Sequence, residues 1–250
     1  MKKIMPIILL CFLISTVQAQ DGETRFGFEF SPSFNWMRSD DNLINSNGLK
    51  LGVRIGGLGE FPLTDWIVIQ GGFAFSFGRG GTLLHKVGGN LVPTSDLSDP
   101  SFNQGQKPLP DDTDITYGLS QLEMPFTLQY IFPMSQRDYD LFFSFPALNL
   151  AIISRTRGKI QATGIDLKGE DLGDDIRTFN LSWGIGAGIR THAQNGKVLT
   201  AGLYYESGLA DLTSNDGSQV LQKPDGSFSI EREDSRGTLS GLILKFAVLF

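Results

Sequence analysis

The sequence of 250 residues contains only one cysteine, Cys11, and this residue lies in an apolar stretch at the N-terminus. We expect that stretch to be removed, and the mature chain would then have no thiol. A chain without thiols can form neither disulfides nor thiolate metal sites. We expect no lipid at Cys11, because Leu10 stands where a lipid-anchored leader requires a small residue.

Histidine and basic residues are also scarce. The chain has two histidines, and its 21 lysines and arginines are outnumbered by 27 aspartates and glutamates, giving a formal charge of −6. No basic stripe is present that could release counterions from phosphates, so the composition excludes nucleic acid as a partner. We also expect no cofactor and no metal site.

Long apolar runs are absent except at the N-terminus. Lys2 and Lys3 precede the apolar stretch Ile4–Ile14, and Val17-Gln18-Ala19 is typical of a signal peptidase site. The stretch is too short for a membrane-spanning helix, which needs ~20 apolar residues. The sequence therefore predicts a secretory signal peptide at residues 1–19 and a single domain at residues 20–250.

What the chain has instead is strict alternation, beginning at Arg25–Trp36. One parity carries phenylalanines and a tryptophan, and the other carries glycine, serine, asparagine and the charged Arg25 and Glu29. A period of two indicates a β-strand whose successive side chains face opposite ways. The run matches the ~9–11 tilted residues of a strand that crosses a bilayer. We therefore expect the aromatic face to contact lipid and the charged face to line a lumen.

Seven further segments alternate in the same manner, and two of them change parity, near Ser120 and near Pro146. A β-bulge would explain the change near Ser120. The sequence thus predicts an all-β fold, an eight-stranded antiparallel up-and-down transmembrane β-barrel of the outer-membrane type. The seven segments are Leu49–Gly56, Ile67–Phe77, Ile115–Phe132, Tyr139–Ser154, Phe179–Arg190, Leu199–Glu206 and Gly241–Phe250.

The connections between these segments are alternately short and long. Outer-membrane barrels have short periplasmic turns and long external loops, so we expect both termini to lie in the periplasm. We also expect Trp36 and Tyr117 to mark the outer membrane interface, and Trp66 and Tyr130 the inner one. The short connections are Phe61–Asp65, Pro133–Asp138 and Thr191–Gly196, and the long ones are Met37–Gly48, Arg79–Asp114, Arg155–Arg177 and Asp211–Gly237.

The charged parity defines a set of candidate lumen residues. Near-equal numbers of both signs inside a narrow barrel should pair, because an unpaired buried charge is costly. We interpret the set as a structural ion-pair network that closes the lumen. Alternatives are a catalytic acid at Glu123 or Glu206, a gate at Arg54 and Arg190, or a small cavity left by lumen glycines. The set is Arg25, Glu29, Lys50, Arg54, Glu60, Glu123, Arg190, Glu206 and Lys245.

Enzymatic motifs are weak. A hydrolase at the barrel rim would need a Ser-His-acid group, and His85 in the second long loop has Ser95, Asp96 and Ser98 nearby in sequence. No nucleophile motif accompanies it, so we expect no enzymatic activity. His192 lies at the short-turn end. The glycines of 184–188 lack the spacing and the lysine of a phosphate-binding loop, and the acidic stretches 111–114 and 171–175 lack EF-hand spacing.

Three segments carry a resemblance to a known family. Gly48–Val53, the segment Gln121–Tyr130 with its Leu122-Glu123-Met124-Pro125, and the aromatic C-terminal strand resemble the PorT-like family of outer-membrane β-barrels. The resemblance implies an eight-stranded outer-membrane barrel and, for the name-giving member, a part in type IX secretion and gliding-associated export. Phe250, with Phe246, also resembles the signal that the barrel-assembly machinery recognises.

These observations predict a monomeric barrel in the outer membrane of a Gram-negative envelope, of structural or surface-interaction type. The long loops, above all 79–114 and 211–237, would form the interaction surface, and the partners would be lipid and, during biogenesis, the barrel-assembly machinery. Two alternatives are an accessory of a secretion or gliding system, which the resemblance implies, and a soluble periplasmic lipocalin-like binder. In the soluble binder the aromatic face would be shielded from solvent.

Overall fold

The structure, a computed structural model, describes residues 23–105, 107–193, 196–214, 216–223 and 225–250. The predicted signal peptide lies outside the described residues. In those ranges the chain forms strands and one short 3-10 helix, η1 (Pro100–Gly105). No helix among the described residues is long and apolar enough to span a membrane.

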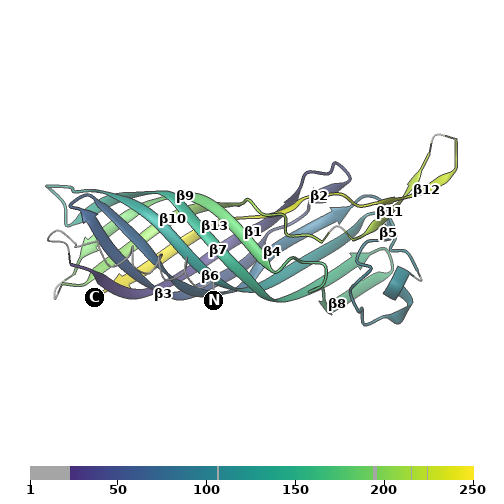
Figure 1. The fold of residues 1–250 in the computed structure, drawn as a ribbon, viewed down its shortest axis with the longest axis horizontal. Coiled ribbons are helices and arrows are strands. Elements are labelled where there is room, and N and C mark those ends of the chain that lie inside the picture. The colour runs from purple at the N-terminus through teal and green to yellow at the C-terminus, as the bar shows by residue number, and fades with distance from the viewer. Residues whose placement is uncertain (1–22, 106, 194–195, 215, 224) are drawn as a thin grey trace, which may run out of the picture.

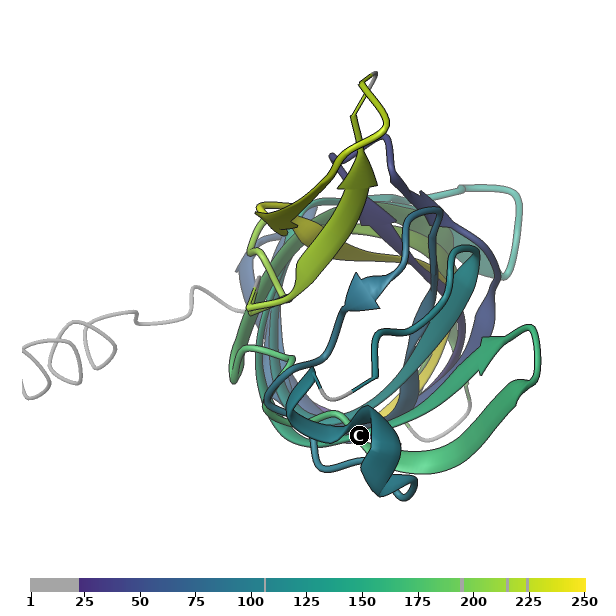
Figure 2. The same ribbon diagram turned by 90° about the vertical axis from the view of Figure 1, so that its right-hand side faces the viewer.

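Eight long strands form a closed antiparallel ring in which each strand pairs with its neighbours in chain order (Figures 1 and 2). The first and last strands close it, from Gly27 opposite Leu249 to Ser39 opposite Gly237. The predicted eight-stranded up-and-down fold is therefore confirmed. The ring strands are β1 (Arg25–Ser39), β3 (Lys50–Thr64), β4 (Ile67–His85), β6 (Thr113–Phe132), β7 (Tyr139–Ala162), β9 (Phe179–His192), β10 (Val198–Gly208) and β13 (Gly237–Leu249).

The aromatic parity of the strands faces outward. Phe28, Phe75 and Phe246 are 70%, 60% and 44% exposed, although they lie in three different strands. Their sequence neighbours of the other parity, such as Glu29 and Ser76, are buried inside the ring. This direction is the one predicted for a barrel in lipid and is opposite to that of a soluble lipocalin-like binder.

The strands at the long-loop end extend further than the sequence predicted. β4 continues to His85 and β7 to Ala162, so the predicted loops 79–114 and 155–177 are partly strand. Parts of the remaining loops form short strands of their own. These are β2 (Ile44–Ser46), β5 (Gly89–Asn90), β8 (Ile165–Asp171), β11 (Ser218–Gln222) and β12 (Phe228–Arg232).

The register shifts at Ser120, as the predicted bulge requires, but the extra residues lie in the neighbouring strands and not in β6. β6 keeps one parity throughout, and Ile115, Tyr117 and Leu119 face inward like Glu123. The irregularities lie in its two neighbours, where the register of β4 shifts between Ser76 and Arg79 and that of β7 shifts at Ser154. The predicted parity change near Pro146 is confirmed, because the β7 register also shifts between Ser144 and Ala147.

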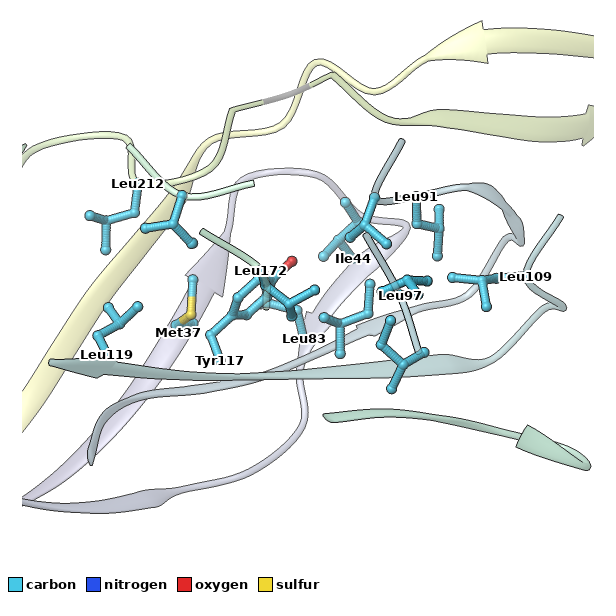
Figure 3. Packing of buried hydrophobic residues seen from close by; sticks show 14 of the residues in the cluster. Met37, Ile44, Leu83, Leu91, Leu97, Leu109, Tyr117, Leu119, Leu172 and Leu212 are labelled. Atoms are coloured by element: carbon cyan, nitrogen blue, oxygen red, sulfur yellow. The ribbon is translucent and has the colours of Figure 1, made fainter. Parts of the chain in front are cut away.

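The inward apolar residues of β6 belong to a hydrophobic core inside the long-loop end of the barrel (Figure 3). Tyr117 is 2% exposed there, so its predicted position at a membrane interface is wrong. This loop-end core fills the mouth of the ring with side chains from the strands and from all four long connections. Its residues are Met37, Ile44, Leu83, Leu91, Val92, Leu97, Phe102, Leu109, Ile115, Tyr117, Leu119, Ile160, Leu172, Ile176, Leu212 and Leu239.

Lumen glycines make room for two inward aromatic rings. A Cβ added at Gly186 would lie 2.3 Å from Cδ1 of Tyr204, and one at Gly188 would lie 2.5 Å from Cζ of Phe142. The two rings pack together with Ile243 and Ala147. The space that the sequence analysis assigned to a possible cavity is therefore occupied by Tyr204 and Phe142.

Candidate functional site

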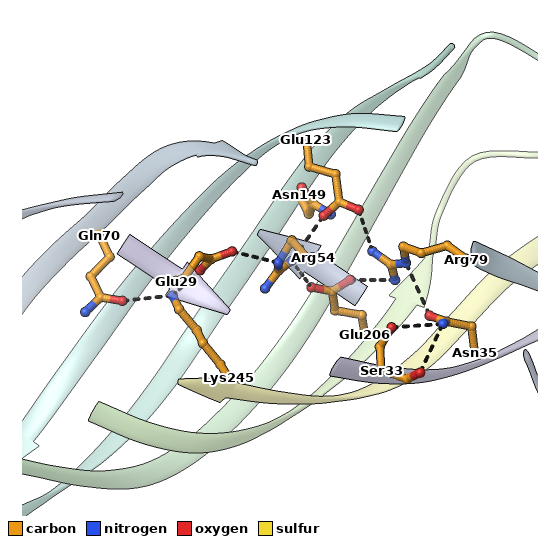
Figure 4. A network of polar contacts seen from close by, with 10 residues as sticks. All are labelled: Glu29, Ser33, Asn35, Arg54, Gln70, Arg79, Glu123, Asn149, Glu206 and Lys245. Atoms are coloured by element: carbon orange, nitrogen blue, oxygen red, sulfur yellow. Dashed lines mark hydrogen bonds and ion pairs between the residues drawn. The ribbon is translucent and has the colours of Figure 1, made fainter. Parts of the chain in front are cut away.

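The centre of the lumen contains a cluster of buried ion pairs built around Arg54 (Figure 4). Its Nε lies 2.8 Å from Oε1 of Glu29, and its Nη1 lies 3.1 Å from Glu123 and 3.2 Å from Glu206. Glu29 also pairs with Lys245 at 3.3 Å. β1, β3, β6, β10 and β13 thus each contribute a charge to the central cluster.

Arg79 completes this cluster from β4. Its two terminal nitrogens lie 3.0 Å from Glu123 and 3.0 Å from Glu206, and its Nε donates to Oδ1 of Asn35. Asn149 of β7 donates to Glu123 at 2.8 Å. Two carboxylates therefore bridge two guanidinium groups, and each carboxylate oxygen involved contacts a charged donor.

A second cluster lies toward the short-turn end and centres on Glu60. Arg190 forms a bidentate pair with it at 2.6 and 2.7 Å, and Arg25 lies 3.5 Å away. Bidentate arginine–carboxylate pairs are among the strongest charge-assisted hydrogen bonds. Gln70 connects the two clusters, because it donates to Glu60 and accepts from Lys245.

The structure brings most of the predicted lumen residues together, with one exception and one addition. Arg25, Glu29, Arg54, Glu60, Glu123, Arg190, Glu206 and Lys245 all belong to the two clusters. Lys50 forms no ion pair within the described part of the chain. The side chain of Lys50 instead lies beside Gly118, and its Nζ is 3.2 Å from the position that a Cβ atom on this glycine would take.

Arg79 was missed because the sequence analysis ended its strand at Phe77 and placed it in a loop. Gly78 has a φ of +70° and takes part in the register shift, so Phe77 faces outward and Arg79, two residues later, faces inward. The dipeptide Gly78-Arg79 directly after an alternating run was the available signal, since an isolated glycine in a strand often marks a bulge.

The lumen arrangement disfavours the catalytic and gating alternatives. Glu123 accepts from Arg54, Arg79 and Asn149, so its carboxylate is occupied rather than presented to a substrate. Glu206 is held by the same two arginines. Arg54 and Arg190 lie in different clusters and each is fixed by carboxylates, which is not the geometry of two residues that open together.

A group of buried polar residues lies under the loops at the other end of the barrel. The hydroxyl of Tyr117 donates to Oδ2 of Asp175 at 2.5 Å, and Ser235 donates to Glu233 at 2.7 Å. Burial, together with the charge of Glu233, raises the pKa of Asp175 to about 7, and burial also raises the pKa of Glu233. The loops therefore enclose two carboxyl groups that hold a proton more tightly than they would in water.

The Ser-His-acid group that the sequence analysis considered around His85 is not assembled. His85 is the last residue of β4 and is buried, not part of a loop, and neither of its ring nitrogens has a hydrogen-bond partner. Ser98 instead donates to Glu170 at 2.6 Å, and the buried hydroxyl of Ser95 has no partner. His192 lies 3.4 Å from Asp140 at the short-turn end.

The glycine-rich stretch lies within a strand and does not precede a helix. Gly184, Gly186 and Gly188 lie within β9, where they pack against β10 and the two lumen rings. Within the described ranges, no three histidine, cysteine, aspartate or glutamate side chains are placed to hold a metal ion.

The closed ring, its apolar outer face and its charged interior agree with a family match. The model of the outer membrane protein beta-barrel domain matches residues 7–222. The chain belongs to this family. No curated protein matches it.

Three solved structures show how the chain compares with other barrels. Ail, the attachment invasion locus protein of Yersinia pestis, is 10% identical with a TM-score of 0.36, over 92% of this chain and 100% of that one. Neisserial surface protein A is 10% identical with a TM-score of 0.39, over 92% and 100%. A major outer membrane protein from Thermus thermophilus is 11% identical with a TM-score of 0.39, over 90% and 99%. Similarities of this size do not bear on function.

As an outer membrane protein beta-barrel domain, the chain is embedded in the lipid of the outer membrane. Proteins of this class are generally assembled by the barrel-assembly machinery. The aromatic outer face is then the surface that contacts hydrocarbon, where each backbone polar group must be paired within the ring. The family match does not single out PorT-like proteins, so that finer resemblance stays a prediction.

Replacing Arg79 should test the central cluster. We expect Arg79→Met to lower the free energy of unfolding by about 3–5 kcal/mol, because Glu123 and Glu206 would each lose a buried partner. Urea unfolding in lipid vesicles measures the change. The matched control is Lys50→Met, which removes a cation of the same predicted lumen parity that has no ion pair among the described residues. Equal losses in the two variants would contradict this assignment.

The raised pKa of Asp175 should make the loop-covered mouth sensitive to pH. Because the folded state holds this proton more tightly than the unfolded chain, whose ordinary pKa is 3.8, the stability that Asp175 contributes to the loops is largest in acid and is lost as pH rises from about 4 to 7. Hydrogen exchange of residues 211–217, corrected for intrinsic rates, gives the ratio of opening at pH 8 to opening at pH 5. This ratio should be smaller in Asp175→Asn than in the wild type, and the exposed Asp234→Asn should leave it unchanged.

Proposed function

We propose that this outer-membrane barrel is a structural or surface-interaction protein whose lumen is closed and whose long loops form the binding surface. It is not an enzyme, it acts as a monomer, and both of its termini lie in the periplasm. The single observation that carries the proposal is the central ion-pair cluster, because it fills the ring with side chains that are already paired with one another.

Closure of the lumen is supported at several levels along the barrel. Leu58, Val198, Ala247 and Leu249 form an apolar cluster inside the ring. The Glu60 cluster, the Phe142–Tyr204 pair, the central cluster and the loop-end core occupy the remaining levels. Small eight-stranded barrels are generally filled by their own side chains. A route for solutes would need several of these groups to separate at once.

The proposed orientation of the barrel in the outer membrane rests on the unequal lengths of the connections between its strands. The short-turn end has the brief connections between β3 and β4, β6 and β7, and β9 and β10, whereas the other end has the accessory strands and the loop-end core. Outer-membrane barrels place their short turns in the periplasm. The loops with β5, β8, β11 and β12 then face the outside of the cell.

The two ends of the chain would carry the signals for export and for assembly into the membrane. In this proposal residues 1–19 are removed as a signal peptide and residues 20–250 form the mature domain. Phe246 and Phe250 would be the assembly signal. Both rings are exposed on the outer surface, and the amide of Phe250 donates to the carbonyl of Phe26 at the seam where the ring closes. A role as a secretion or gliding accessory would add a partner at the loops, and no contact in the described chain favours it.

Electrical recordings test the closed lumen. Purified protein inserted into planar lipid bilayers should show no stable conductance above that of the lipid alone, because the charged lumen groups are paired and the apolar levels exclude hydrated ions. Regular single-channel steps would disprove the closed lumen.

Cysteine labelling tests the orientation, since the predicted mature chain has no cysteine of its own. On intact cells a membrane-impermeant maleimide should label Lys223→Cys in a long loop. Gln136→Cys in a short turn should be labelled only after the outer membrane is permeabilised. The reverse pattern would place the loops in the periplasm and would contradict the proposed surface role.

A further inference from the structure

Three cations gather on the outer face of the barrel near its loop end. They are Arg155 and Arg157 of β7 and Lys50 of β3. None of the three forms an ion pair with a carboxylate of the described residues, although the chain as a whole carries a formal charge of −6. We propose that this basic patch binds the phosphate group of a membrane lipid whose acyl chains lie along the apolar outer face of the barrel.

The outer end of β7 carries the two arginines on its outward side. Arg155 and Arg157 are exposed, whereas Thr156 between them is buried. Because successive side chains of a strand face opposite ways, both guanidinium groups point out of the ring. Lys159 continues the same row, and its Nζ lies 3.5 Å from Asp166 of β8. The two arginines are therefore the members of this row that remain available to an anion.

Lys50 reaches the same part of the outer face from another strand. Its Nζ lies 3.2 Å from the position that a Cβ atom on Gly118 of β6 would take. Gly118 stands between Tyr117 and Leu119, which are buried inside the ring, so its own Cβ position faces outward. Gly118 also lies opposite Arg157 in the register of β6 and β7. The ammonium group of Lys50 thus lies on the outer face close to β7.

The surface beside the basic row is low. The outward positions of β6 at this level carry small residues, which are Thr116, Gly118 and Ser120. Small side chains leave room for a phosphate group to approach the cations of β7 and Lys50 from the same side. Arginine suits this ligand, because its guanidinium group can donate two parallel hydrogen bonds to phosphate oxygens.

The carboxylates around the patch reduce its positive charge without cancelling it. Asp171 lies opposite Arg157 in the register of β7 and β8, but its Oδ1 accepts from the amide of Gly173 at 3.0 Å. Asp166 pairs with two lysines of β7 and β8, and Asp114 accepts from an asparagine side chain at 2.7 Å. Counting the lysines paired with Asp166, five basic residues stand against these three acidic ones.

The patch lies at the level where lipid headgroups are expected. The outward apolar residues of β6 run from Phe132 to Leu122, and those of β7 run from Leu141 to Ile152. Runs of this length are close to the ~9–11 tilted residues that a strand needs to cross the hydrocarbon. Arg155 follows directly beyond the β7 run, so the patch begins where the apolar face ends.

This position favours a lipid over a free anion. Apolar side chains followed by unpaired cations match the order of acyl chains and phosphate in a lipid, and basic sites next to the membrane bind anionic headgroups. As a member of its family the chain is embedded in such a membrane. The proposed orientation assigns the patch to the outer leaflet, and the ligand is then of the lipid A type, an acylated sugar with phosphate groups. Only this choice of leaflet rests on the proposed function.

Native mass spectrometry of the complete mature protein tests the patch. The protein is released from detergent micelles that contain defined amounts of diphosphoryl lipid A, and bound lipid is counted from the mass. We expect saturable binding of one lipid molecule per protein. Lipid A without its phosphate groups should bind at least tenfold more weakly, and inorganic phosphate at the same concentration as the lipid should not displace it.

Two double variants locate the binding. Arg155→Gln with Arg157→Gln should weaken lipid A binding at least tenfold. The midpoint of unfolding should stay at the wild-type value, because both side chains are exposed and have no ion pair among the described residues. The matched control is Arg137→Gln with Lys197→Gln, which removes two exposed cations at the short-turn end and should leave lipid A binding unchanged.

Equal binding of lipid A with and without phosphate would overturn the inference, because the acyl chains alone would then explain the binding. Displacement by inorganic phosphate would overturn the lipid as the ligand, and an equal loss in the two double variants would overturn the patch as the site. These failures are separable from failure of the proposed function. A barrel whose loops are labelled only after permeabilisation, but which binds lipid A through Arg155 and Arg157, keeps this site and loses its assignment to the outer leaflet.

Discussion

The backbone of a chain in hydrocarbon cannot form hydrogen bonds with its surroundings, so its strands must satisfy one another. In this protein that constraint is met by the pairing of β1 with β13, which turns a meander of strands into a ring. Once the ring closes, every strand has one face toward lipid and one toward a narrow interior. Alternation of apolar and polar residues then follows necessarily, and any charge on the inner face is removed from bulk water.

The enclosed charges explain the organisation of the lumen. A buried charge without a partner is costly, whereas Arg54 and Arg79 share Glu123 and Glu206 so that no member of the group is left alone. These four residues come from four strands, and a slip of one strand by a single residue would turn its charge toward lipid. The ion pairs therefore help to specify register as well as to fill space. The glycines opposite Tyr204 and Phe142 also help to fill the lumen. A large ring on one strand fits only where the facing residue of the next strand has no side chain.

The sequence was sufficient where a period of two runs unbroken. It predicted eight strands, the outward phenylalanines and the inward Glu29, Arg54 and Glu206. It failed where the backbone departs from that period, since the shift at Gly78 turns Arg79 inward, and where the apolar residues of β6 lie on its inner face. Ile115, Tyr117 and Leu119 have the composition of a lipid-facing stripe, yet they lie above the charged lumen and pack against the loops. An apolar stripe on a strand can face either lipid or a packed core. Which of the two it faces depends on residues that are far away in sequence, so a local pattern does not contain this information.

The loop-end core gives the outer half of the barrel a different physical basis from the inner half. At the level of the ion pairs, the structure is held together by strand pairing in the ring and by charge. At the loop end, it is held together by ordinary hydrophobic packing between strands and loops. The strands β4, β6 and β7 extend past the charged level into this packing, and β11 is attached to the mouth by its pairing with β5. β12 is the last strand in that series, and Phe228 and Ile230 remain largely exposed. The loop-end core thus supports the loops and ends before β12, whose outer edge stays open. The same core closes the lumen, so the closed lumen and the exposed loop surface have one structural origin.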